Sequence, residues 1–372
     1  MEIIFDSQGT IESFKNALAD LMKQPHINSI FILSCDNNSY DQETIAPILK
    51  AQNKTCFGGI FPKIIHEGQV YDTGNIFVGF FFDVETIVID NLGNKELNLD
   101  DVIIRAFPEA LDQNLTMLVL VDGLSSGIGY LMESLFDQFG LEINYLGGGA
   151  GSLSLKQCPC VMSSKGLHQD SAILAAIPRN SGVGVSHGWT PISEALKVTE
   201  SEGHRIISLN WEPAFKEYRR IVELHSKLSF DSEEFFEIAK AYPFGIAKLD
   251  AEMVIRDPLL HDKNDLVCVG EVPQGTFVHV MHGDTESLIS AAGDAMEQAL
   301  EDTSGLKAEL TVFIDCISRM LFLNQDYPRE VHAVTKNGLS MVGALTLGEI
   351  ANNGRDYLEF YNKTAVIGLL TD

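Results

Sequence analysis

The sequence predicts a mixed α/β protein, a layered sandwich of mixed β-sheets flanked by helices. Three observations predict it: strand-like apolar runs that end near an Asp, helical patterns that follow them, and glycine-bearing strands followed by hairpins. Together they form a unit of strand, helix, strand and hairpin that occurs three times in 372 residues. Each unit has an apolar face that it can bury only against a neighbour, which favours packed sheets.

The first unit begins with the apolar run 29–36, which is typical of a buried strand and ends at Asp36. A helical pattern follows over 41–52, then the strand around Gly58 and Gly59. The turn-rich segment 68–74 indicates a hairpin, and the apolar residues from 76 to 82 indicate the closing strand.

The second unit repeats this plan from residue 116. Its strand, 116–123, has Asp122 near its end, and apolar residues at helical spacing predict a helix over 129–139. The glycine strand 145–149 and a hairpin near 166–172 follow, and the apolar run 173–177 closes the unit.

The third unit is C-terminal. The run 310–316 is a strand with Asp315 near its end, and a helical segment surrounds Arg319. The strand 341–344, a turn near 352–354 and a closing strand over 364–370 complete it.

The repeated residues have structural and functional interpretations. The glycines of the second strands permit a tight turn, a bulge, or a close approach by a backbone or ligand. Asp36, Asp122 and Asp315 lie where strands lead into helices, a common ligand position in α/β proteins. Helix N-capping is the alternative for each of them.

A long middle section separates the second and third units. Residues 211–215 start a helix, and the acidic segment 231–234 follows. The pattern becomes polar and helical near 222–240, and we place a boundary there between domains 1–225 and 226–372.

Composition limits the possible functions. The formal net charge is −26, which argues against binding to nucleic acid or to anionic membranes. No basic N-terminal signal and no apolar run of about 18 residues occurs. Six scattered cysteines without CxxC spacing fit free thiols in the cytoplasm.

Short catalytic signatures are absent: the sequence has no P-loop, no GxSxG and no HExxH. The run of Gly147, Gly148 and Gly149 offers backbone amides for an anion, but the residues after it look extended, not helical. Cys158 and Cys160 form a CxC pair that suits soft metals or redox exchange, or simply a hairpin.

Two histidine segments are candidates for ligand contacts. His187 and Trp189, with a Gly between them, suit either the aromatic wall of a ligand site or a packed core histidine. His282 lies at a strand-to-helix transition, where it is a candidate metal or haem-iron ligand or a turn histidine.

Arg319 is the candidate anion-binding residue of the third unit. Its guanidinium group has the geometry to clamp a carboxylate. The alternative is an ion pair, for which Glu349 is the expected partner.

These segments together resemble the FIST family, named for F-box and intracellular signal transduction. The resemblance rests on the glycine run 147–151, the His187-Gly188-Trp189 segment and the segment from Asp315 to Arg319 with Gly348-Glu349-Ile350. Tyr242-Pro243-Phe244-Gly245-Ile246 is similar to the start of the family's C-terminal half.

The resemblance covers about residues 20–370. It implies a sensory protein of FIST-N plus FIST-C type from a bacterium, and not an enzyme. Family members bind small ligands, with amino acids proposed, and one subset binds haem and senses nitric oxide.

The stand-alone layout is similar to that haem-binding subset. Output then requires a partner such as a histidine kinase or a cyclic-di-GMP enzyme, for example a diguanylate cyclase. Haem on His282, or alternatively on His187, is the leading expectation for the ligand. A metabolite sensor with Arg319 on a carboxylate and Trp189 as a wall is the alternative, and an enzyme that uses Cys316 or Cys158 is a third hypothesis.

Overall fold

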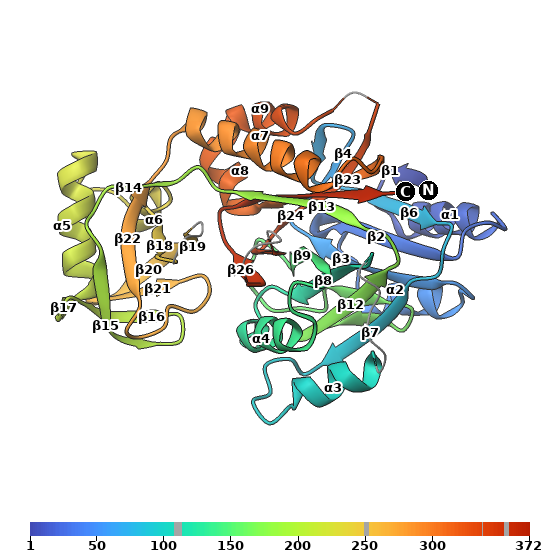
Figure 1. The fold of residues 1–372 in the computed structure, drawn as a ribbon, viewed down its shortest axis with the longest axis horizontal. Coiled ribbons are helices and arrows are strands. Elements are labelled where there is room, and N and C mark those ends of the chain that lie inside the picture. The colour runs from blue at the N-terminus through green and yellow to red at the C-terminus, as the bar shows by residue number, and fades with distance from the viewer. Residues whose placement is uncertain (108–113, 249–252, 337, 353–356) are drawn as a thin grey trace.

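The computed structural model describes residues 1–107, 114–248, 253–336, 338–352 and 357–372. It has a large body and a smaller lobe, which lie on the right and left of Figure 1. The described part of the body contains three six-stranded sheets with helices outside them, and the lobe has a nine-stranded sheet of its own. The expected mixed sheets flanked by helices are therefore confirmed.

The body consists of three copies of one unit. The first copy is β1 (Glu2–Asp6), α1 (Ile11–Met22), β2 (Ser29–Cys35), η1 (Asp36–Asn38), α2 (Gln42–Lys50), β3 (Thr55–Phe61), β4 (Lys63–His66), β5 (Gln69–Tyr71) and β6 (Asn75–Phe80). The second is β7 (Glu85–Asp90), α3 (Leu99–Ala106), β8 (Thr116–Asp122), α4 (Ile128–Phe139), β9 (Asn144–Ala150), β10 (Val161–Ser163), β11 (Gly166–His168) and β12 (Ser171–Ile177).

The third copy is split by the lobe. It starts with β13 (Ser181–Ser186) and resumes with α7 (Thr285–Asp302), β23 (Ala308–Cys316), α8 (Ile317–Leu323), η2 (Asn324–Asp326), α9 (Tyr327–Ala333), β24 (Ser340–Thr346), β25 (Glu349–Ala351), β26 (Glu359–Tyr361) and β27 (Ala365–Thr371). The predicted strands and helices of all three units are confirmed. Of the predicted turn at 352–354, residues 353 and 354 lie outside the described residues.

Sheet pairing follows one rule in all three copies. The strand pairs β2–β3, β8–β9 and β23–β24 are parallel, and the closing strands β6, β12 and β27 pair antiparallel with the first strand of each pair. Each hairpin joins the sheet of another copy: β4 pairs β24, β10 pairs β3 and β25 pairs β9. This exchange links the three copies into one body.

The glycines of the second strands occupy equivalent positions. Gly58, Gly147 and Gly343 lie opposite Ile32, Val119 and Phe313 in the parallel ladders. A Cβ atom on these glycines would lie 1.8, 1.8 and 2.1 Å from the carbonyl oxygen of that opposite residue. The close-approach interpretation is therefore confirmed, and the approaching group is backbone.

The three aspartates are not equivalent, contrary to the sequence interpretation. In register, Asp315 corresponds to Ser34 and Val121, whereas Asp122 corresponds to Cys35 and Cys316. Asp36 lies one residue further on, in η1. A shift of one residue reverses the face of a strand side chain, so Asp315 and Asp122 point to opposite faces of their sheets.

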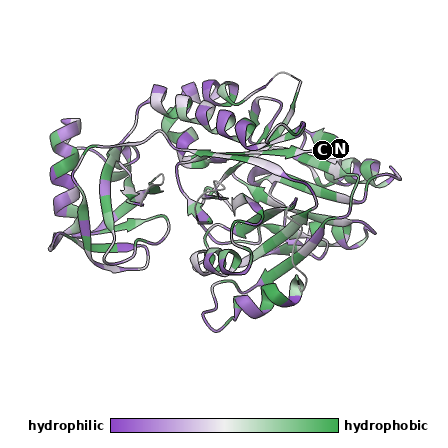
Figure 2. Cartoon of the chain, in the orientation of Figure 1, coloured by the Kyte–Doolittle hydropathy of each residue, from purple (hydrophilic) through white to green (hydrophobic). Residues whose placement is uncertain are grey.

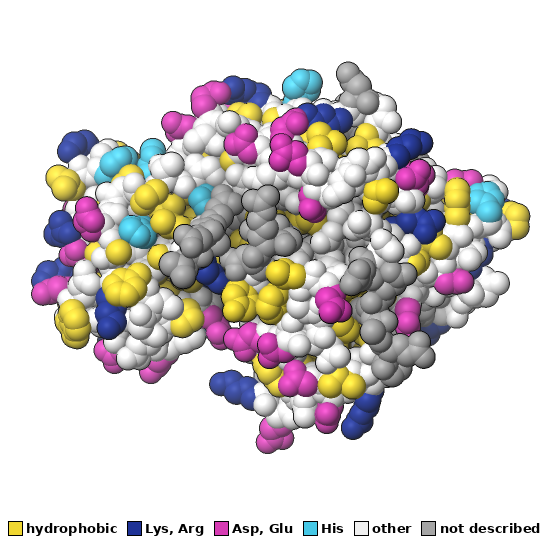
Figure 3. Space-filling view, viewed as in Figure 1, with side chains coloured by type: hydrophobic (Ala, Val, Ile, Leu, Met, Phe, Trp, Pro, Cys, Tyr) yellow, Lys and Arg dark blue, Asp and Glu magenta, His cyan; other side chains and the backbone are white. Residues whose placement is uncertain are grey.

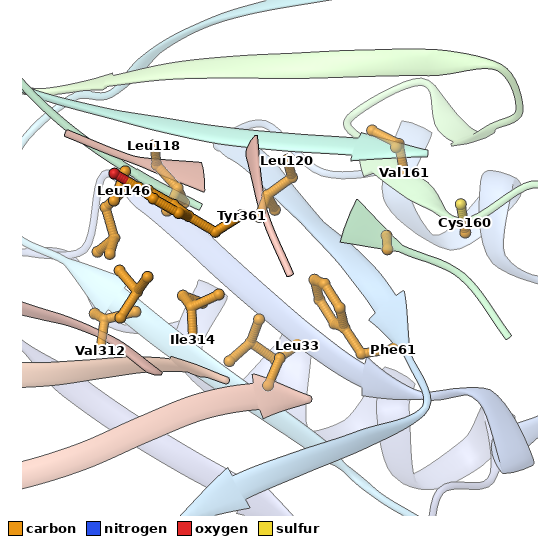
Figure 4. Close-up of a cluster of buried hydrophobic side chains, with 14 of the residues drawn as sticks. Leu33, Phe61, Leu118, Leu120, Leu146, Cys160, Val161, Val312, Ile314 and Tyr361 are labelled. Atoms are coloured by element: carbon orange, nitrogen blue, oxygen red, sulfur yellow. The ribbon is translucent and has the colours of Figure 1, made fainter. Parts of the chain in front are cut away.

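The inner faces of the three sheets share one core. Leu33, Leu120 and Ile314 are equivalent, fully buried and part of the same cluster, which Figure 4 shows. The outer faces of the second and third sheets form two further cores under their helices. In Figure 2 the helices of the body show both hydrophilic and hydrophobic residues along their ribbons.

The lobe is one continuous segment between β13 and α7. Its elements are β14 (Thr190–Pro191), β15 (Leu196–Glu202), β16 (Arg205–Leu209), β17 (Glu212–Pro213), α5 (Ala214–Ser226), α6 (Phe235–Ala239), β18 (Phe244–Ile246), β19 (Val254–Arg256), β20 (Pro258–Asp262), β21 (Asp265–Cys268) and β22 (Phe277–His282). The helix expected after 211–215 is α5, and the predicted boundary region 222–240 lies inside the lobe.

Candidate functional site

The candidate site is the carboxyl end of β23, where the lobe meets the body. Carboxyl ends of parallel strands are the usual ligand positions of α/β sheets. Here the chain leaves the body after β13 and returns at α7, so the lobe covers this end of the third sheet (Figure 1). The buried charged residues described below gather at this junction.

Arg319 is fully buried at the start of α8 and is surrounded by protein acceptors. Its Nε donates to Oε1 of Glu330 at 2.8 Å, and Nη2 also contacts that oxygen. Its remaining donors reach the carbonyl oxygens of His187 at 2.7 Å, Lys363 at 3.1 Å and Leu288 at 2.9 Å.

The ion-pair partners of Arg319 are Glu330 and Asp315, and not the expected Glu349. The Nε atom of Arg319 lies 3.2 Å from Oδ1 of Asp315, whose other oxygen accepts a hydrogen bond from the Tyr327 hydroxyl at 2.5 Å. The side chain of Asp315 points from β23 toward the helices that carry Arg319 and Glu330. Burial raises the pKa of Asp315 well above its usual range, although Arg319 opposes this shift.

Glu349 is also fully buried, in β25. Its carboxyl oxygens accept from the Thr346 hydroxyl at 3.0 Å and the Thr364 amide at 3.2 Å. Burial raises the pKa of Glu349 to about 8. A protonated carboxyl group is therefore present in this site at neutral pH.

His187 and Trp189 form a buried turn beside α7. The Nδ1 atom of His187 accepts from the Trp189 amide at 2.9 Å, and the indole Nε1 donates to the carbonyl oxygen of Lys363 at 3.1 Å. Between them, Gly188 has φ 77°, and a Cβ there would lie 2.5 Å from the carbonyl oxygen of Ser287. Burial, and then the charge of Arg319, lower the pKa of His187 to about 3.

Lys363 connects the body to the lobe, and sequence reasoning did not single it out. It is fully buried, and its Nζ donates to the carbonyl oxygen of Lys240 at 3.0 Å and lies 3.1 Å from Oδ2 of Asp257. Both partners belong to the lobe. The same ammonium group lies 5.2 Å from the centre of the Trp189 ring, within cation–π range.

Asp257 is the lobe's buried carboxylate, and its sequence context gave no signal. It is fully buried, and burial raises its pKa, while Lys363 and Ser318 act in the opposite direction. Two further contacts cross the junction nearby: Arg256 donates to the carbonyl oxygen of Phe360 at 3.0 Å, and Lys248 pairs with Glu359. Residues 359–363 therefore act as the body's contact segment for the lobe.

The glycine run lies in β9, between β8 and β25. Gly147 and Gly148 are in the ladder with β8 and also oppose Ile350 and Glu349. The Gly149 amide donates to the carbonyl oxygen of Gly348 at 2.8 Å, and a Cβ at residue 149 would lie 2.6 Å from the carbonyl oxygen of Leu347. The run thus brings the Glu349 segment against the second sheet.

His282 lies apart from this network, at the end of β22. It is half-buried, and its ring centre lies 4.8 Å from that of His225 and 5.0 Å from that of Tyr242. Burial, and then His225, lower the pKa of His282. The histidines on the lobe are among the cyan side chains at the left of Figure 3. Within the described ranges, no group of three or more His, Cys, Asp or Glu side chains is arranged to hold a metal ion.

An open groove of about 440 Å³ lies elsewhere, between α7 and α9, and contains none of the predicted site residues. Across the described ranges of the chain, no helix is both long and apolar enough to cross a membrane.

Two family matches cover most of the chain. The FIST N domain matches residues 29–212, and the FIST C domain matches residues 214–352. The chain is also similar to the uncharacterized protein MJ1623 of Methanocaldococcus jannaschii, with 21% identity over 312 residues. This similarity covers 80% of the chain but 48% of the relative, so the chain spans about half the length of that protein.

Proposed function

The chain belongs to the FIST family of sensory signal-transduction domains, and from this premise we propose that it senses a small metabolite bound beneath the lobe. In this proposal the ligand changes how the lobe sits on the body. A separate cytoplasmic signalling protein, such as a histidine kinase or a cyclic-di-GMP enzyme, responds to that change. The protein itself catalyses no reaction.

The observation that carries the proposal is the buried ion pair between Lys363 and Asp257 across the junction. Buried ion pairs are costly to desolvate and often no more stable than apolar contacts, so they are weak candidates for simple stabilisation. Strongly perturbed groups at an interface of this kind are typical of functional sites. A ligand that competes for either member would directly alter the contact between lobe and body.

The proposal changes the role expected of Arg319. Its donors are occupied by Glu330 and by three carbonyl oxygens. A ligand carboxylate would have to displace these acceptors. We therefore assign Arg319 to positioning His187 and Lys363, whose carbonyl groups it holds.

A thermal-shift screen with amino acids, amines, carboxylates and haemin tests this function, because a ligand selective for the folded state raises the unfolding midpoint. Any compound that does so is then tested by hydrogen exchange. We expect slower exchange in residues 240–257 and 359–363 on both sides of the junction. Compounds that raise the midpoint without altering exchange there would place the ligand elsewhere, and a screen without any positive compound would contradict the metabolite proposal.

The output is tested with candidate kinases and diguanylate cyclases from the same genome. We expect the ligand to change the partner's activity only in the presence of this protein. Lys363→Met should abolish the ligand response, whereas Lys336→Met, which removes an exposed ion pair with Glu297, should retain it.

Haem as a nitric oxide receptor is a second candidate, favoured by the lowered pKa values of His187 and His282. Burial disfavours the charged form of both histidines, and the neutral form is the one that binds iron. His282 fits better because it is half-buried, whereas His187 is only 6% exposed and its Nδ1 already accepts a hydrogen bond. The rings of His282 and His225 are too close for a porphyrin to lie between them, so His282 would be the single protein ligand.

The absorption spectrum of the protein with added haemin tests this candidate. We expect a Soret band distinct from that of free haemin, and its loss in His282→Ala but not in His187→Ala. The exposed His204 provides a control variant, His204→Ala. A spectrum identical to that of free haemin would contradict the haem candidate and leave the metabolite proposal to its own test.

A further inference from the structure

Several buried side-chain oxygen atoms of the site beneath the lobe lack a well-aligned hydrogen-bond donor among the described residues. Asp257, Asp315, Glu330 and Asn362 are buried, and each has at least one side-chain oxygen without a well-aligned hydrogen-bond partner among the described residues. Unsatisfied buried polar atoms are uncommon in folded proteins and require an explanation. Each of these oxygen atoms can accept a hydrogen bond, so a ligand that donates N–H groups would satisfy them.

The charged groups of this site are paired within the chain, so no buried cation is left free for an anion. Two cationic side chains are buried here: Arg319 contacts the carboxyl groups of Asp315 and Glu330, and Lys363 contacts that of Asp257. The whole chain carries a net charge of −26, which attracts cations and repels anions on approach. An anionic ligand would have to displace a carboxyl group from Arg319 or Lys363 and would add to the overall negative charge.

The indole ring of Trp189 already forms a cation–π contact at this site. The ammonium group of Lys363 lies over the indole of Trp189, 5.2 Å from the ring centre. Indole is the strongest of the protein aromatic rings in attracting cations. The environment of Lys363, with a carboxylate on one side and an indole on the other, is therefore an environment for an organic ammonium group.

The equivalent positions in the other copies do not share this environment. By register, Lys363 corresponds to Thr73 and Asp170, both of which are half-buried. Asp170 and Lys363 have similar positive φ angles of 46° and 51°, which supports the equivalence. Only the third copy combines this position with a lobe that buries it.

We infer that the site beneath the lobe binds a small organic cation with an ammonium or guanidinium group, which Asp257 and the amide oxygen of Asn362 accept beside Trp189. This inference rests on the proposed sensory function and names the ligand class for it. Because Asp257 and Lys363 are fully buried, the lobe must move to admit the cation. The ligand's N–H groups then donate to the oxygen atoms of Asp257 and Asn362 that lack a well-aligned donor.

Isothermal titration calorimetry with butylamine, putrescine and agmatine, compared with butyrate, succinate and butanol, tests the inference. Measurements in about 0.3 M salt suppress non-specific attraction of cations to the acidic surface. We expect saturable binding of at least one amine, and no binding of the acids or the alcohol. Asp257→Asn should weaken amine binding at least about tenfold, because it removes a charge-assisted hydrogen bond. Asp137→Asn, which changes an exposed acid on α4, should leave it unchanged.

A pair of variants at residue 362 protects the test against misfolding of Asp257→Asn. Asn362→Leu removes the acceptor oxygen and should weaken amine binding, whereas Asn362→Asp adds a carboxylate and should strengthen it. Structural damage would weaken binding in both variants.

Two results would overturn the cation inference without contradicting a ligand-sensing function. One is preferential binding of butyrate or succinate, and the other is amine binding that is equal in the wild type and a folded Asp257→Asn variant. If a junction ligand from the metabolite screen is neutral or acidic, the inference also fails, and if no compound binds at all, the proposed function fails with it.

Discussion

The carboxyl ends of β8 and β23 occupy equivalent places in two copies of the same unit, yet they are completed differently. At β8, Asp122 accepts the Leu124 amide at 3.1 Å, the Asp170 amide at 2.8 Å and the Gln157 side chain at 2.9 Å. At β23, some oxygen atoms of buried carboxyl groups lack a well-aligned donor among the described residues, and the lobe covers this end. The same scaffold thus has one end whose aspartate is fully paired within the chain and one end where buried oxygen atoms lack well-aligned partners.

The second and third copies differ in the segment that follows their first strand. In the second copy, α3 follows β7 after a short connection, whereas in the third copy the whole lobe lies between β13 and α7. The lobe brings Asp257 to the end of the sheet and removes Lys363 from solvent. The comparison teaches that the repeat supplies the scaffold and the insertion supplies the candidate site.

The largest effect should come from removing the central cation of the β23 end. Arg319→Met leaves the buried carboxyl groups of Glu330 and Asp315 without their partner and should destabilise the fold by about 3–5 kcal/mol. Chemical denaturation measures this loss. Arg329→Met, which breaks exposed ion pairs with Glu286 and Asp326, should have a much smaller effect, because solvent screens exposed pairs. Equal losses in both variants would contradict the central role of Arg319.

Gly147 and Gly343 occupy equivalent positions in the second and third copies, so replacing either should destabilise the fold to a similar extent. Gly147→Ala and Gly343→Ala push a Cβ into a carbonyl oxygen of the adjacent strand and should each cost about 1–3 kcal/mol. Gly293→Ala is the control: residue 293 lies inside α7, where the nearest atom to a new Cβ is 4.0 Å away. That variant should gain about 0.5–1 kcal/mol from helix propensity. A tolerated alanine at 147 or 343 would show that the strands can separate at that position.

Glu349, which lies near the β23 end, should make the stability of the folded protein depend on pH. Its pKa rises from 4.5 to about 8 on folding, so the folded protein keeps a proton that the unfolded chain releases in this range. Below pH 4.5 the Glu349 carboxyl group is protonated in both the folded and the unfolded state. Above pH 4.5 it ionises in the unfolded chain only, which lowers the free energy of unfolding as the pH rises toward 8. Glu349→Gln removes this penalty. Its stability relative to the wild type should therefore increase with pH, by at most about 1.4 kcal/mol per pH unit. Urea unfolding at pH 5 and pH 8 measures the change, and a pH-independent difference between the two proteins would contradict it.

The smallest effect concerns thiol reactivity near the β8 end. Burial, and then the charges of Asp36 and Asp122, raise the pKa of Cys158, and burial raises that of Cys316 well above its usual range. Both should react with iodoacetamide more slowly than free cysteine at pH 7, because the thiolate is the nucleophile. Asp122→Asn should accelerate labelling of Cys158 and leave Cys316 unchanged, as read by mass spectrometry. Rapid labelling of either thiol in the wild type would instead support the thiol-enzyme hypothesis.

Much of the scaffold could be predicted because its signals are local. Apolar runs such as 116–123, helical spacing over 129–139 and glycines at the second strands each follow from neighbouring residues. The edge strands and the helices that begin each copy were not recognised as part of the repeat. The lobe separates one of them, β13, from the rest of its copy by about a hundred residues, which hides the period.

The candidate site could be predicted only in part. His187, Trp189, Arg319 and Glu349 were singled out as chemically unusual, and the structure brings their segments to the same junction. Lys363 and Asp257 gave no such signal, because one is a lysine before a strand and the other an aspartate beside a proline. Their pairing depends on a contact between segments more than a hundred residues apart.

The sequence by itself determined the three strand–helix–strand units, the glycines on which close strand approach depends, and the acidic charge that disfavours anionic partners. Only the tertiary structure decided which sheet each hairpin joins. It also decided that the lobe is inserted at the end of the third sheet, and which charges are buried. The physical reason is that periodicity and backbone conformation act over a few residues, whereas burial and charge pairing are set by segments that meet only after folding.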